Sequence, residues 1–336
     1  MAKQYKNIEG EIRKDSHRNY FFTVIEEDID NLINPFRKQF KFVHCPNCAS
    51  SNVYKDFQKG QFSYYRCSVC DTLYVNPRPP INALNNFYLK SKAVAASTQS
   101  LLDNEEGRKK HVFTPRAKQI LQFFKSIGRV EGRVIEIGCS VGSFLDVLKK
   151  RSRFQVEGID PSESAHKIAA KKRLKVHKTT LEKFDPAGSK YDIAISLETI
   201  EHIFSPQAFL LKINRLLKKG GFIVFTTPNL HGFDTLALEK YYKNIHAPCH
   251  LNYFNVDTID SLLTRSGFKI IEKRTPGVLD IEIVRKQIGE GACPQPTSAF
   301  VRHLVSGTSP EIQANFQKFL QDNRLSGNML VFARKV

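Results

Sequence analysis

The sequence of 336 residues has no stretch that approaches the ~20 consecutive apolar residues needed for a membrane-spanning helix. Its first twenty residues are charged throughout and lack the apolar segment of a secretory signal peptide. Internal repeats and low-complexity tracts are also missing from the sequence. These absences favour a globular protein without membrane insertion, and we expect it to be cytoplasmic.

Acidic residues are scarce relative to basic ones. The chain has 33 Asp and Glu against 51 Lys and Arg, which gives a net charge of +18. Such a surplus raises the question of a polyanionic partner. The basic runs at 149–153 and 171–178 contain no interleaved aromatics, so solvated helix faces are the favoured interpretation. Charge alone leaves both interpretations open.

Four of the seven cysteines form two C-x2-C pairs with eighteen residues between them. This spacing is typical of a zinc site with four thiolate ligands, which is closed and has no position for substrate. We therefore predict structural Zn²⁺ at Cys45, Cys48, Cys67 and Cys70. The other three cysteines are scattered and odd in number, as in proteins that keep their thiols reduced.

The order of predicted elements divides the chain into four parts. Residues 1–40 form a lead-in, 41–80 a zinc-ribbon module that ends in a proline-rich stretch, and 81–130 a helical connector. From 131 to 336, strands and helices alternate, which predicts an α/β fold with a parallel, doubly wound sheet. A helix is expected over 205–221, ending at a glycine pair, and a helical insertion at about 278–326.

A glycine-bearing turn follows the apolar segment at 133–137. A dinucleotide fingerprint needs glycine at 138, 140 and 143, but serine occupies the last two positions. Gly138 and Gly142 remain, with Glu136 just before them. Asp160 ends the next predicted strand, where a carboxylate can accept the hydroxyl groups of a ribose.

Glu136, Gly138 and Gly142 resemble the first motif of class I S-adenosylmethionine-dependent methyltransferases. The segment at 191–229 resembles the same family, in which a strand is followed by E-x-x-E-H, a helix ending in L-K-x-G-G and a strand ending in T-P-N. The resemblance covers roughly residues 130–336. It implies a seven-stranded, Rossmann-like methyltransferase sheet with a final antiparallel hairpin, preceded by the small zinc ribbon, and S-adenosylmethionine as cofactor.

The resemblance also implies which residues contact the cofactor. The turn approaches its methionine portion and ribose, Asp160 binds the ribose, residues 180–182 flank the adenine, and the end of the fourth strand lines the other side. The cofactor-binding residues expected on this basis are Glu136, Gly138, Cys139, Ser140, Gly142, Asp160, Leu181, Leu197 and Glu198. For Cys139 we expect a packing role rather than thiol chemistry.

In the E-x-x-E-H motif, Glu198, Glu201 and His202 are predicted to share one face of a helical turn. Ubiquinone-pathway O-methyltransferases and small-RNA 2′-O-methyltransferases use this motif for a metal. The resemblance therefore implies a divalent ion such as Mg²⁺ or Mn²⁺, with His250 (or His246) as a further ligand. A role in fastening the cofactor pocket without metal is the favoured interpretation. In that case His202 or His250 is the expected general base.

The stretch at 67–80 resembles the zinc-binding module of methyltransferases that act on sugars in surface-polysaccharide and antibiotic pathways. This implies a sugar or nucleotide-sugar acceptor. In those enzymes a tyrosine–histidine pair performs acid–base chemistry, and the sequence does not assign that pair here. One alternative is an RNA methyltransferase that uses the ribbon and the basic runs, although the chain lacks the N/D-P-P-Y/F signature of base amino-group methylation. Another is a cofactor-binding protein without turnover.

Overall fold

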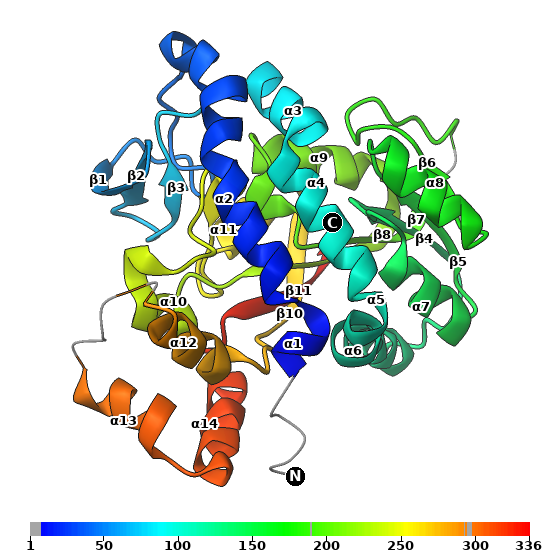
Figure 1. Ribbon diagram of the computed structural model, residues 1–336. Helices are drawn as coiled ribbons and strands as arrows, with labels where there is room; N and C mark the ends of the chain where they lie inside the picture. The colour runs from blue at the N-terminus through cyan, green and yellow to red at the C-terminus, as the bar shows by residue number, and fades with distance from the viewer. Residues whose placement is uncertain (1–7, 189, 292, 294–297) are drawn as a thin grey trace.

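The computed structural model describes residues 8–336 except 189, 292 and 294–297. Its centre is a seven-stranded sheet in the order β10-β11-β8-β7-β4-β5-β6 (Figure 1). β11 runs antiparallel to both neighbours, and the other pairs are parallel. The strands are β4 (Arg133–Ile137), β5 (Gln155–Ile159), β6 (Lys175–His177), β7 (Tyr191–Leu197), β8 (Leu217–Pro228), β10 (Phe268–Arg274) and β11 (Asn328–Lys335). The predicted α/β fold with a seven-stranded Rossmann-like sheet is confirmed.

Helices cover both faces of this sheet because side chains alternate along each strand. In β4, Ile135 and Ile137 point to the face packed by α9 (Pro206–Leu216) and α11 (Asp260–Arg265). Val134 points to the opposite face, which α6 (Thr114–Ser126) and α7 (Ser143–Arg151) cover. Because β4, β5 and β7 run parallel, the loops that follow them emerge together at the carboxyl edge of the sheet. Open α/β sheets bind ligands at this edge.

The helix expected over 205–221 is shorter than predicted, since α9 ends at Leu216. Leu217 already pairs with Tyr191 of β7, and the register shifts before the next pairs. Gly220, with φ of +69°, lies in this irregular stretch of β8. The glycine pair therefore bends a strand instead of ending a helix.

The cysteine-containing module forms a second, antiparallel sheet in the order β1-β2-β3-β9. Three of its strands are local in sequence: β1 (Val53–Lys59), β2 (Phe62–Cys67) and β3 (Leu73–Val75). The fourth, β9 (Asn252–Tyr253), follows β8 far downstream and pairs with β3. Backbone hydrogen bonds thus join the module to the segment between β8 and β10.

A helical layer precedes the large sheet in the chain. It comprises α1 (Ile8–Ile12), α2 (Asp15–Leu32), the 3₁₀ segment η2 (Asn34–Gln39), α3 (Ile81–Lys90), α4 (Lys92–Asp103), α5 (Glu105–Arg108) and the π-helical turn η3 (Lys109–Phe113). Figure 1 shows α2 and α4 side by side. Asp28 of α2 accepts hydrogen bonds from the Ser91 hydroxyl at 2.6 Å and the Ala93 amide at 2.8 Å, so it fixes the start of α4.

The remaining helices follow β5 and the carboxyl ends of the later strands. They are α8 (Glu163–Lys171), the 3₁₀ turn η4 (Ile200–His202), α10 (Phe233–Leu238), η5 (Glu239–Tyr241), α12 (Asp280–Gly289), α13 (Ala299–Gly307) and α14 (Pro310–Asp322). The last three lie between β10 and β11 in sequence, and Figure 1 places α13 and α14 at the periphery. Among the helices of the described residues, none is both long and apolar enough to cross a membrane.

Candidate active site

The loop between β4 and α7 turns sharply at the carboxyl edge of the sheet. Gly138, Ser140 and Gly142 all have positive φ, at 75°, 48° and 73°. A Cβ on Gly138 would lie 2.8 Å from the Thr199 hydroxyl, and one on Gly142 would lie 2.6 Å from Leu174 Cδ1. Both positions therefore require glycine, while the serine tolerates the left-handed conformation with its side chain in place.

Asp160, directly after β5, joins this loop to the next one. Its Oδ2 accepts a hydrogen bond from the Ser140 amide and its Oδ1 from the Ser162 amide, both at 2.9 Å. Burial raises the pKa of the carboxyl group above its usual range. Each carboxylate oxygen keeps a free lone pair, so the fixed carboxylate can still accept the two hydroxyl groups of a ribose.

Glu136 lies on β4 just before the loop and is only 3% exposed. Within the described part of the chain, its buried Oε2 has no hydrogen-bond partner. Burial, and then the charge of Asp160, raise its pKa well above the usual range. Buried polar atoms are nearly always paired. The orphaned oxygen therefore fits a ligand that brings a donor or a positive charge, such as the ammonium of an amino acid moiety.

Three further residues that we expected at the cofactor, Cys139, Leu181 and Leu197, lie in mainly apolar surroundings. Cys139 is buried, a Cβ on Gly158 would lie 2.6 Å from its sulfur, and burial raises the pKa of its thiol. Leu181 belongs to the cluster packed on the α9 face of the sheet, and Leu197 is half-buried at the end of β7. Cys139 therefore has the packing role that the sequence suggested.

Glu198 is placed differently from the prediction. Its amide donates to the Thr226 carbonyl at 3.0 Å, so strand geometry continues to this residue, which itself has φ of +49°. The 3₁₀ turn η4 begins only at Ile200. The prediction that Glu198, Glu201 and His202 share one helical face is therefore wrong. The exposed Glu198 carboxylate instead accepts a hydrogen bond from Asn328 Nδ2 at 2.8 Å.

Glu201, His202 and His250 do converge, with one ligand atom from each within 4.8 Å of the others. Glu198 is not a member of this group. Glu201 is 1% exposed, and its Oε2 accepts a hydrogen bond from the Thr227 hydroxyl at 3.0 Å. Its Oε1 lies 3.7 Å from His202 Nε2. Burial and the nearby Glu198 raise the pKa of Glu201 well above its usual range.

The two histidines of this group are fixed in the same tautomer. His202 Nδ1 lies 2.6 Å from the Cys249 carbonyl, and His250 Nδ1 lies 2.9 Å from the Asn244 carbonyl. A carbonyl only accepts, so each Nδ1 carries the proton and each Nε2 keeps a lone pair. Burial lowers the pKa of both rings, so both are neutral near pH 7. Each can therefore accept a proton or bind a metal through Nε2.

Tyr88 of α3 joins this cluster, although nothing in its helical context distinguished it in the sequence. Its hydroxyl donates to the Cys249 carbonyl at 2.7 Å and lies 3.1 Å from His202 Nδ1. His246, the alternative ligand, lies apart from the group. Its ring packs edge-on against Phe21 and Phe22, with centroids 5.6 and 5.4 Å away.

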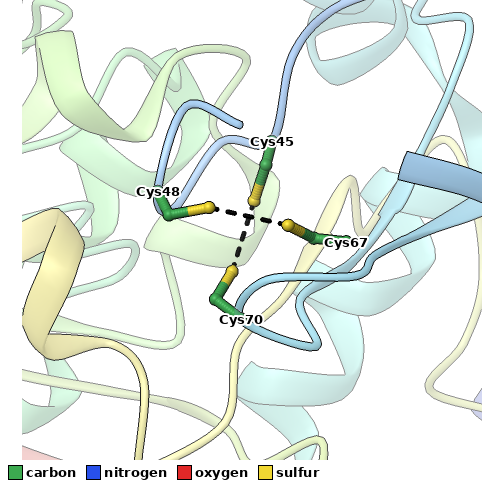
Figure 2. Close-up of side chains that lie close together, drawn as sticks. All are labelled: Cys45, Cys48, Cys67 and Cys70. Carbon is green, nitrogen blue, oxygen red and sulfur yellow. Dashed lines mark hydrogen bonds between the residues drawn. The ribbon is translucent and has the colours of Figure 1, made fainter. Parts of the chain in front are cut away.

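The four predicted zinc ligands come together in a second cluster, and Figure 2 shows their sulfur atoms pointing toward a common centre. The Cys45–Cys70 and Cys48–Cys67 sulfur pairs are each 3.5 Å apart. Tetrahedral zinc with Zn–S bonds of ~2.3 Å requires sulfur separations of ~3.8 Å. The cluster therefore has the donor set and nearly the size of a zinc site.

Side chains after β9 fasten the cysteine turns to the large domain. The Cys70 carbonyl accepts hydrogen bonds from Asn255 Nδ2 at 3.1 Å and from the Thr258 hydroxyl at 2.8 Å. In the first turn, Asn47 Nδ2 donates to the Thr258 carbonyl at 3.0 Å, and its Oδ1 accepts from the Leu262 amide at 3.1 Å. Both cysteine turns thus depend on the same segment.

A cleft of about 670 Å³ opens beside the active-site edge of the sheet. Glu198 and Pro228, at the carboxyl ends of β7 and β8, form part of its wall. The residues around Glu136 and Asp160 do not line it. The lining does include basic side chains from four regions of the chain, namely Arg13, Arg116, Lys273, Arg274 and Arg324. The cleft therefore adjoins the glycine loop without including it.

Comparison with known proteins agrees with this geometry. Residues 108–273 match the model of a methyltransferase domain family. A ubiquinone biosynthesis O-methyltransferase of Bradyrhizobium sp. is 35% identical over 112 residues, covering 31% of this chain and 44% of that protein. A ubiquinone biosynthesis O-methyltransferase from Rhizobium leguminosarum is 32% identical over 162 residues, which cover 44% of this chain and 64% of that protein. The chain spans about half the length of the curated relatives it matches.

Among solved structures, a similar one is an S-adenosylmethionine-dependent methyltransferase of Thermotoga maritima, described as a possible histamine N-methyltransferase. It is 21% identical, covers 71% of this chain and 97% of its own, and has a TM-score of 0.46. The match over residues 108–273, the sheet order and the glycine loop together support a class I S-adenosylmethionine-dependent methyltransferase domain in this chain.

Proposed function

We propose that the chain transfers a methyl group from S-adenosylmethionine to a small-molecule acceptor. The observation that carries this proposal is Asp160, held by backbone amides of two loops beside Glu136 with its orphaned oxygen. When bound, the cofactor supplies a sulfonium methyl that is already activated, so the protein mainly has to align the reactants.

The residues at this edge fit the cofactor as follows. Glu136 meets its ammonium group, and Asp160 accepts hydrogen bonds from its ribose. The backbone of the glycine loop, from Gly138 to Gly142, accommodates the methionine portion, because any side chain at these two glycines would collide with neighbouring atoms. Leu181 flanks the adenine, while Leu197 and Glu198 line the opposite side.

Proton removal from the acceptor is assigned to His202, with His250 beside it. Tyr88 and the Cys249 carbonyl hold the His202 ring, and its lowered pKa keeps Nε2 free to accept a proton at neutral pH. This tyrosine–histidine contact has the composition of the acid–base pair in sugar methyltransferases. It supports a sugar or nucleotide-sugar acceptor.

A divalent metal at Glu201, His202 and His250 is a second candidate for activating the acceptor. The supporting observation is that both Nε2 lone pairs and Glu201 Oε1 are available within one group. Two imidazoles and a carboxylate suit Mn²⁺ better than Mg²⁺. Titration calorimetry with Mn²⁺ on the wild type and Glu201→Gln tests this site, and equal behaviour of the two proteins would exclude it.

The proposed function is tested by binding of S-adenosylhomocysteine, the product of the cofactor, measured by titration calorimetry. We expect Asp160→Asn to weaken binding by about 100-fold, because the acceptor loses its charge and one of its two oxygens is replaced by a donor. Glu131→Gln, an exposed carboxylate before β4, is the matched control and keeps wild-type affinity. Unchanged affinity in Asp160→Asn would refute the assignment of the cofactor site.

A further inference from the structure

Three arginines from the segment that precedes the large sheet in the chain lie near the cleft without a carboxylate partner. Arg13 follows α1, Arg108 ends α5 and Arg116 is on α6. In the part of the chain that the structure describes, none of the three has a carboxylate within ion-pair distance. Arg116 has one side-chain hydrogen bond, from Nη2 to Asn328 Oδ1 at 3.1 Å.

These arginines are only partly exposed, which makes the missing partners significant. The Arg108 Nε is buried and has no hydrogen-bond partner among the described residues. Burial lowers the pKa of Arg108 to about 10, and the like charge of Arg13 adds to this. Burial also lowers the pKa of Arg116. Half-buried guanidinium groups that repel one another are destabilising unless an anion compensates them.

Glu198 is the carboxylate that compensates part of this charge, since it counteracts the lowered pKa of both Arg108 and Arg116. It does so across Asn328, which bridges the Arg116 guanidinium and the Glu198 carboxylate. One exposed carboxylate near three arginines leaves a net positive charge at this end of the cleft.

The other charged groups of the cleft do not remove this surplus. Lys273, Arg274 and Asp322 are already paired, with Asp260, Glu272 and Lys318 respectively. Asp234 and Asp280 also line the cleft but are themselves buried, and burial raises the pKa of both, that of Asp234 to about 7. The cleft therefore favours an anionic guest at its arginine end.

Gln119, which also lines the cleft, adds an independent sign of a ligand. Its Oε1 is buried and lacks a hydrogen-bond partner within the described residues. This atom is a neutral acceptor and would suit a hydroxyl or amino group of the same guest. Charged donors and one neutral acceptor together are typical of a site for a polar small molecule that bears an anion.

We propose that Arg13 and Arg116, supported by Arg108, bind a phosphate or carboxylate group of the methyl acceptor and place the acceptor beside Glu198. This inference rests on the proposed function, because it assigns the acceptor's position relative to the cofactor loop. The carboxylate of S-adenosylmethionine is the other possible source of such an anion. The cleft favours the acceptor, since its lining excludes Glu136, Asp160 and the glycine loop.

Titration calorimetry with inorganic pyrophosphate at low ionic strength tests the site. We expect the wild type to bind this probe, and both Arg13→Met and Arg116→Met to weaken binding by about tenfold, because each loses a charge-assisted contact. Arg116→Lys keeps the charge but not the planar fork, so a smaller loss is expected. Arg151→Met, on the exposed end of α7, is the matched control with wild-type affinity.

A parallel titration with S-adenosylhomocysteine separates the two sources of the anion. We expect its affinity to stay within about twofold of wild type in Arg13→Met and Arg116→Met. The proposal is overturned if pyrophosphate affinity is the same in all variants, or if only S-adenosylhomocysteine affinity falls. Failure of the wild type to bind S-adenosylhomocysteine would instead refute the proposed function while arginine-dependent pyrophosphate binding still supported an anion site. Circular dichroism verifies that each variant is folded. If Arg116→Met does not fold, Arg13→Met, at a half-exposed position, still tests the proposal.

Discussion

The Arg78 guanidinium donates a hydrogen bond to the Asn252 side-chain oxygen at 2.5 Å, and this contact fixes the turn that carries Glu201 and His202. Asn252 Nδ2 donates in turn to the carbonyl groups of that turn, at 3.2 Å to Glu201 and 2.8 Å to Ile203. Arg78 itself is 1% exposed and also donates to the backbone carbonyls of Val75 and Phe204. The cysteine module is thereby linked to the candidate catalytic histidine.

Replacing Arg78 by lysine tests this link. We expect Arg78→Lys to lower the free energy of unfolding by about 2–4 kcal/mol, since a buried cation would lose several acceptors. Methyl transfer should slow by about tenfold while affinity for S-adenosylhomocysteine is unchanged, because the turn holds His202 and not the cofactor loop. Denaturant unfolding measures the stability, a methyl-transfer assay the rate, and titration calorimetry the affinity. Arg66→Lys, whose partly exposed ion pairs contribute ~1 kcal/mol or less, is the control. Wild-type stability of Arg78→Lys would show that the link is dispensable.

The cysteine cluster should contain about one equivalent of zinc in protein purified without chelator. Its turns have a small core of their own, built largely from the cysteines and Tyr74, so the metal provides much of their stability. We expect Cys67→Ser to lose the zinc and to lower the melting temperature by roughly 5–10 °C. Elemental analysis and a thermal scan measure both. Cys293→Ser, outside the cluster, should keep the metal. Metal-free wild-type protein would contradict the zinc site.

Binding of the cofactor should change the protonation of Glu136. Burial and the charge of Asp160 raise its pKa, which favours the protonated carboxyl group when no cation is beside it. An ammonium group at Oε2 would favour the ionised form, so up to one proton should be released on binding. Calorimetric titration of S-adenosylhomocysteine in buffers of different ionisation enthalpy measures this number. Glu136→Gln should release none, and zero release from the wild type would argue against contact with the ammonium group.

Acid should destabilise the protein through its buried histidines. Burial lowers the pKa of His246 to about 4, so between this value and the unfolded value of about 6.5 the unfolded chain binds more protons. Stability is therefore fully present above pH ~6.5 and falls as the pH drops through this window, by at most ~3 kcal/mol for this residue. Burial also lowers the pKa of His202 and of His250, so both contribute to acid sensitivity in the same direction.

Denaturant unfolding at a series of pH values measures this dependence. His246→Phe should make the free energy of unfolding depend less steeply on pH. The new ring can keep the edge-on contacts with Phe21 and Phe22 but has no group that titrates. The exposed His44→Gln is the control and should keep the wild-type profile. If stability of His246→Phe depended on pH as steeply as that of the wild type, the buried His246 ring would not be a source of acid sensitivity.

Most of the large sheet was predictable because its signals are local. Apolar strands, the positions of Gly138 and Gly142, and Asp160 at the end of the following strand all lie within short segments whose order fixes the topology. The error at residues 217–221 arose where helix propensity and a glycine pair agreed locally, but pairing of Leu217 with β7 prevailed. Strand geometry likewise overrode the helical spacing expected at Glu198.

The sequence by itself determined the class of sheet, the glycine loop with the Asp160 carboxylate beside it, and the two cysteine pairs. Only the tertiary structure decided that β9 completes the ribbon sheet, that Tyr88 meets His202, that Arg78 holds Asn252, and that three arginines gather near Glu198. The physical reason is separation along the chain. Periodicity and turn chemistry act over a few residues, whereas hydrogen bonds and charge interactions between distant segments exist only after the whole core has packed.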